Sequence, residues 1–66
     1  MNIDEKKLKL AMARACLDVK ALGKAADVGK ATLIRVLNGH GENVRYSTAG
    51  KLARALGVDV TEIISA

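Results

Sequence analysis

The chain has 66 residues, a formal net charge of +4 and a single aromatic residue, so it is long enough for one small domain with an aliphatic core. It has no proline and is rich in Ala, Leu, Lys and Arg, which favours an all-α fold over a β-sheet protein. A single cysteine excludes an internal disulfide, and neither a signal peptide nor a membrane-spanning run is evident, so we expect a cytoplasmic protein.

Residues 2–15 are predicted to form the first helix. Asn2 and Glu5 have the spacing of a capping box, and Asp4 adds negative charge to the first turn, where the helix dipole favours it. Apolar residues at helical spacing form the expected buried stripe: Leu8, Ala11, Met12 and Ala15. Leu10 lies outside this stripe and is expected to be partly exposed.

Residues 18–38 predict two short helices joined by a tight turn. The first helix, 19–26, follows the N-cap residue Asp18, and the second spans 30–37. Each has one face of apolar or small residues: Val19, Leu22, Gly23 and Ala26, then Leu33, Val36 and Leu37. The turn at 27–29 is so short that the helices must cross steeply and leave the second one prominent, as in a helix-turn-helix.

Gly23 is expected to allow close approach of the following helix, because glycine in mid-helix otherwise costs about 1 kcal/mol relative to alanine. After a polar loop, residues 46–56 predict another helix, which Gly57 ends. Its expected inward residues are Tyr46, Ala49, Leu52, Ala53 and Leu56. Asp59 and Glu62 form a second capping box, which predicts a short fifth helix. That helix contains Val60, Ile63 and Ile64. The expected fold is a single all-α domain of five helices over residues 1–66.

The excess of positive over negative charge lies in the middle of the chain, where residues 20–54 hold seven Lys and Arg against two acidic residues. This distribution suits a polyanionic partner, although a solvated surface without a partner is the alternative. The sequence offers no Ser-His-Asp set or cluster of metal ligands, since His40 and Cys16 stand alone. We therefore expect no enzyme activity, metal, cofactor or small-molecule ligand.

The segments VGKATLIRVLNG and KLARALGVDVTEII, in this order and spacing, resemble the lambda-repressor-like (Cro/CI-type, XRE) helix-turn-helix family over about residues 8–64. The resemblance implies a transcriptional regulator, expected to be a repressor, that places helix 30–37 in the major groove of double-stranded DNA. Three positions depart from the family: Val19 replaces a glutamine that binds phosphate, Gly23 replaces alanine, and Asp27 replaces glycine. The first departure weakens one phosphate contact, and none removes the motif.

The resemblance aligns Lys30, Ala31, Ile34 and Arg35 with positions that read bases. Arg35 can donate two parallel hydrogen bonds to guanine O6 and N7, and Lys30 can reach guanine or a phosphate. Ala31 and Ile34 can pack on a thymine methyl group. A surface ion pair is the alternative for Arg35, and incidental exposure is the alternative for Ile34.

The residues predicted to contact phosphates are Val19, near a helix N-terminus with free backbone N–H groups, and Lys20, Lys24, Thr32, Asn38, Asn43 and Arg45. One module of this size has limited affinity, so we expect a homodimer on a two-fold operator. Ile63 and Ile64 are the predicted dimer interface, because a short helix cannot bury both. Their burial in the core is the alternative.

Two other functions stay open. An antitoxin-type module of the same fold binds a partner protein as well as DNA, usually through an extra tail, and we expect no such tail because the sequence ends at Ala66. RNA binding is less expected, because aromatic stacking platforms are missing. The operator sequence and the inducing signal cannot be derived from the residues.

Overall fold

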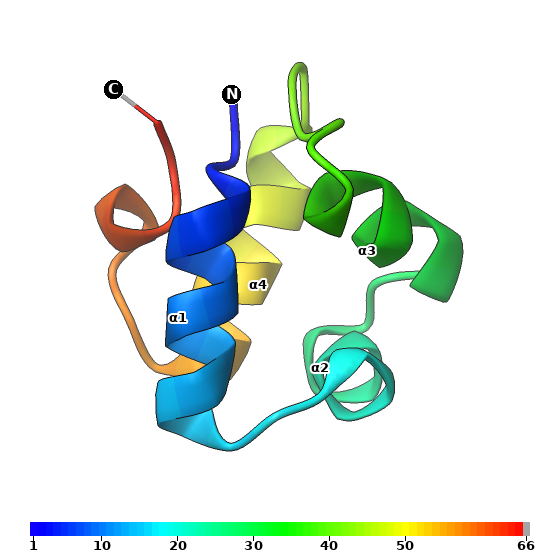
Figure 1. Cartoon of the computed structure of the whole chain (residues 1–66), viewed down its shortest axis with the longest axis vertical. Coiled ribbons are helices and arrows are strands. Elements are labelled where there is room, and N and C mark those ends of the chain that lie inside the picture. The colour runs from blue at the N-terminus through cyan, green and yellow to red at the C-terminus, as the bar shows by residue number, and fades with distance from the viewer. Residues whose placement is uncertain (66) are drawn as a thin grey trace.

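The computed structural model describes residues 1–65, which form four α-helices and one 3-10 turn (Figure 1). The elements are α1 (Glu5–Ala15), α2 (Val19–Ala26), α3 (Lys30–Leu37), α4 (Tyr46–Leu56) and the 3-10 turn η1 (Val60–Glu62). Helices α1 and α4 pack together, with α2 and α3 on one side of them and η1 on the other. The all-α class is confirmed for the described residues, whereas the fifth α-helix was a wrong prediction.

The core is aliphatic, as the composition predicted, and each α-helix contributes at least one leucine or valine that is fully buried. The largest fully buried side chains are Leu8, Leu22, Leu33, Val36, Leu52 and Ile63. The predicted bounds of α2, α3 and α4 are confirmed. Their ends follow local signals, since Asp18 accepts the backbone N–H of Ala21 (2.8 Å) and Gly57 adopts a left-handed conformation. Leu10, outside the predicted stripe of α1, is 64% exposed.

The first helix starts three residues later than predicted. Asp4, rather than Asn2, is the N-cap of α1, and its carboxylate accepts the backbone N–H groups of Lys6 and Lys7. Asn2 instead lies in an extended segment, where its backbone carbonyl accepts the N–H of Ser65. The predicted capping box of Asn2 with Glu5 was therefore wrong, because pairing with distant parts of the chain holds residues 1–4 out of the helix.

The C-terminal segment shows why the fifth helix is a single turn. Asp59 and Glu62 form the predicted capping box, and the Thr61 hydroxyl and backbone N–H donate to the Asp59 carboxylate, which lowers the pKa of that carboxyl. The chain then leaves the helical path, because the Ile63 carbonyl accepts the N–H of Asp4 and Ile64 forms an antiparallel bridge with the N-terminal segment. These bonds replace those that a further helical turn would make.

Gly23 lies where α2 meets the turn that leads into α3. A Cβ atom at this position would lie 3.1 Å from the Val28 carbonyl oxygen and 3.3 Å from Leu33 Cδ1. The predicted close approach is thus confirmed. The turn itself is formed by Asp27 in the left-handed conformation, and the Val28 N–H donates to the Gly23 carbonyl at 3.0 Å. This contact fixes the direction in which α3 leaves the turn.

The two glycines inside helices provide a matched test of this contact. Gly23→Val adds side-chain volume against the turn and is expected to lower the free energy of unfolding by about 1–3 kcal/mol. Gly50→Ala adds a Cβ in open space on α4 and is expected to raise it by about 1 kcal/mol. Urea denaturation followed by circular dichroism measures both values. Equal stability of Gly23→Val and the unaltered chain would show that the contact does not constrain the turn.

Candidate nucleic-acid interface

The outer face of α3 carries every residue predicted to read bases. Lys30, Ala31, Ile34 and Arg35 are exposed, while the opposite face of the helix is buried in the core. Ile34 is 41% exposed, an apolar side chain among polar neighbours. The predicted orientation of the helix is therefore confirmed, and this face can meet a partner without rearrangement of the chain.

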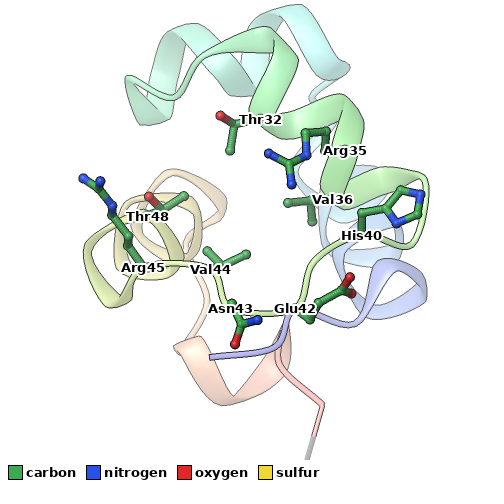
Figure 2. Close-up of a pocket in the computed structure, with 9 residues that line it drawn as sticks. All are labelled: Thr32, Arg35, Val36, His40, Glu42, Asn43, Val44, Arg45 and Thr48. Atoms are coloured by element: carbon green, nitrogen blue, oxygen red, sulfur yellow. The ribbon is translucent and has the colours of Figure 1, made fainter.

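An open groove of about 430 Å³ lies between α3 and the start of α4 (Figure 2). Its lining residues are Thr32, Arg35, Val36, His40, Glu42, Asn43, Val44, Arg45 and Thr48. The guanidinium group of Arg35 points into the hollow from α3, whereas Arg45, on the opposite wall, extends outward. The groove thus has one arginine on each wall.

Three of the residues predicted to contact phosphates meet in this groove, namely Thr32, Asn43 and Arg45. The others lie elsewhere on the surface. They are Val19, Lys20 and Lys24 on α2, and Asn38 at the end of α3. Val19 is half-buried, and the other three are exposed. The structure therefore places these predicted contacts on more than one element around α3.

The basic side chains of α2 and α3 form no ion pair with an acidic residue in the part of the chain that the structure describes. The two ion pairs within residues 1–65 join Lys9 to Glu5 (3.5 Å) and Arg14 to Glu62 (3.6 Å), all on α1 or η1.

Gly29, the N-cap of α3, has no side chain to accept a hydrogen bond from the first turn. Backbone N–H groups at such a helix start suit an anion.

Sequence reasoning missed five residues of the groove. His40, Glu42 and Val44 were assigned only to a polar loop, Val36 only to the buried face of its helix, and Thr48 was not singled out. Loop residues have no periodic pattern, so only the packing of the loop between α3 and α4 reveals that they face the same hollow. Glu42 is the acidic residue among those that line it, and it reduces the positive charge there.

The two residues predicted as a dimer interface differ in exposure. Ile63 is 0% exposed and belongs to the core, so its expected place on the surface was wrong. Ile64 is half-buried. Ile63 directly follows η1 and belongs to the same core cluster as the buried residues of α1 and α4. The dimer itself stays a prediction.

Among residues 1–65, no group of three or more His, Cys, Asp or Glu side chains is placed to hold a metal ion. The described helices also include none with the length and apolarity needed to cross a membrane.

Comparison with protein families matches residues 7–66 to the Cro/C1-type HTH DNA-binding domain. The match covers nearly the whole chain. The chain belongs to this family. Neither the curated proteins nor the solved structures gave a match. In this Cro/C1-type domain, the helix-turn-helix is formed by α2, the turn at residues 27–29 and α3.

Tyr46, the first residue of α4 in this Cro/C1-type domain, is 78% exposed. Its predicted inward position was wrong. Helical side chains tilt toward the N-terminus of the helix, so that of the first residue projects past the end of α4 instead of over its buried turns. The other predicted inward residues are buried, namely Ala49, Leu52, Ala53 and Leu56.

Tyr46→Ala is therefore expected to change the free energy of unfolding by no more than about 0.5 kcal/mol, as for other surface positions. Leu52→Ala on the same helix, at a fully buried position, is expected to lower it by about 2–5 kcal/mol. Urea denaturation of both variants measures the difference. A loss for Tyr46→Ala as large as that for Leu52→Ala would contradict the exposed position.

Proposed function

We propose that this chain is a transcriptional repressor that binds a two-fold symmetric DNA operator as a homodimer, with α3 in the major groove. The observation that carries the proposal is the outer face of α3. Its Arg35 side chain is exposed, has no ion-pair partner within residues 1–65 and points into an open groove (Figure 2). A side chain in this state is free to bind a base edge.

Base reading is assigned to four residues. Arg35 donates two parallel hydrogen bonds to guanine O6 and N7, a contact that contributes about 1–3 kcal/mol of discrimination. Lys30, at the start of α3, reaches a guanine or a phosphate. Ala31 and Ile34 pack on thymine methyl groups, and the exposure of the apolar Ile34 supports this role.

Phosphate contacts fix the position of α3 without reading sequence. Thr32, Asn43 and Arg45 act from the groove between α3 and α4. Contacts from the other side of α3 are assigned to the backbone N–H near Val19 and to the side chains of Lys20, Lys24 and Asn38. Because several of these groups are cationic, affinity falls steeply as salt rises.

Two copies bind more tightly than one, since each contributes a small surface. The half-buried Ile64 supports an interface at the C-terminal segment, where an apolar side chain remains partly exposed. Ile63 takes no part in it. The bound dimer represses by covering the operator, which excludes other proteins from the same DNA.

Selection of bound sequences from random duplex DNA tests the assignment of the reading face. Arg35→Ala is expected to lose sequence preference at one or two base pairs per half-site, because the guanine contact is absent. Lys24→Ala, the matched control, is expected to weaken binding to all sequences equally and to lower the slope of log affinity against log salt by about 1. An unchanged preference profile for Arg35→Ala would show that α3 does not read bases through this residue.

The same selection with the unaltered chain tests the dimer. We expect two inverted half-sites with centres about 34 Å, or one helical turn, apart. Enrichment of a single half-site without a symmetric partner would contradict the homodimer, while a defined half-site would still support the reading face.

A further inference from the structure

Residues 1–4, here called the N-terminal strap, lie in an extended conformation beside the loop that leads into α4. Four hydrogen bonds join the strap to this loop. Three run from Ile3 N–H to the Gly41 carbonyl (3.0 Å), from Val44 N–H to the Met1 carbonyl (2.9 Å) and from Asn43 N–H to Asn2 Oδ1 (3.2 Å). The fourth runs from the N-terminal ammonium group of Met1 to the Val44 carbonyl (3.3 Å). The side chain of Ile3 anchors the strap, since it is only 6% exposed and belongs to the core.

The contact between strap and loop is too close for any side chain at Gly41. A Cβ atom there would lie 2.8 Å from the Ile3 carbonyl oxygen and 3.3 Å from Ile3 Cβ. Gly41 is buried, and its neighbours are the strap and Val36 of α3. A glycine at this point therefore lets the strap lie directly against the backbone of the loop.

The bonded part of the loop forms one wall of the groove (Figure 2). Asn43 and Val44 line this wall, and Arg45 follows them as the N-cap of α4. Asn43 has a φ of 60°, a left-handed conformation that is uncommon for residues other than glycine. Its N–H is the group that donates to Asn2, so the strap helps to hold the loop in this conformation.

The family match begins at residue 7, so the strap lies outside the part of the chain that it covers. The strap is thus not described by the match to the Cro/C1-type domain. Two hydrogen bonds on the opposite side fix the strap to the C-terminal segment. They run from Ser65 N–H to the Asn2 carbonyl (3.0 Å) and from Asp4 N–H to the Ile63 carbonyl (2.9 Å).

We propose that the N-terminal strap is a positioning element for DNA binding, which holds the loop so that Asn43 and Arg45 reach the phosphate backbone beside the site read by α3. This inference rests on the proposed function. The strap touches no base, so it sets the strength of binding to any duplex and leaves the choice of sequence to α3.

Two variants break the contact in different ways. Gly41→Ala forces the strap away from the loop, and Asn2→Ala removes the side-chain acceptor of the Asn43 N–H while Ile3 stays in the core. Both are expected to lower affinity for operator and for random duplex by the same factor, about three- to tenfold, and to lower the salt slope by about 1. Ser65→Ala is the matched control, because it removes a hydroxyl that donates to the Asn2 carbonyl on the other side of the strap, and it is expected to bind as the unaltered chain does.

Affinities are measured by fluorescence anisotropy at several salt concentrations, after circular dichroism shows that each variant is folded at the temperature used. A variant that is folded but merely less stable keeps its salt slope, so a lower slope identifies a lost phosphate contact. If Gly41→Ala does not fold, Asn2→Ala alone decides the result. Unchanged affinity and slope for Asn2→Ala would overturn the inference. Failure of the unaltered chain to bind any duplex would overturn the proposed function and the inference with it.

Discussion

The approach of Gly23 to the turn between α2 and α3 is the contact on which the position of the proposed reading helix depends. Glycine at this position lets the Val28 carbonyl and the Leu33 side chain lie against α2. Leu33 is on the buried face of α3, so the same contact decides which side of the helix enters the core. The side opposite to it carries Arg35 and must therefore face solvent. The packing of an uncharged, aliphatic face thus determines where the charged face is presented.

Stability and the proposed DNA binding are supplied by different parts of the chain. The aliphatic core stabilises the fold, whereas exposed charges contribute little to it even when they are paired. The cationic side chains of α2 and α3 take no part in the ion pairs formed within residues 1–65, so no such pair has to break for them to meet a polyanion. The groove beside α3 adds a second surface, which depends on a loop and on the strap that holds it. Because the helices and the loop already have a fixed conformation, binding DNA would cost less conformational entropy than if they became ordered only in the complex.

The helices around the motif could be predicted because their signals are local. Asp18 caps α2 and Gly57 ends α4, and both residues act through atoms within a few positions along the chain. The start of α1 could not be predicted in this way, since Asn2 and Asp4 are equally good N-cap residues. Hydrogen bonds to the C-terminal segment and to the loop decide between them, and no local pattern encodes these pairings. For the candidate site, helical spacing predicted the outer face of α3, whereas the groove depends on the packing of residues 40–44, which have no periodic pattern.

The proposed DNA-binding surface consists of the outer face of α3 and the adjoining groove. Titration of the ¹⁵N-labelled chain with a short duplex at low salt, followed residue by residue in NMR spectra, tests this assignment. The largest shifts are expected at residues 30–35 and 43–48, while the signals of the exposed side of α1 around Leu10 are expected to stay unchanged. Shifts centred on α1, or spectra that do not respond to duplex DNA, would contradict the assignment.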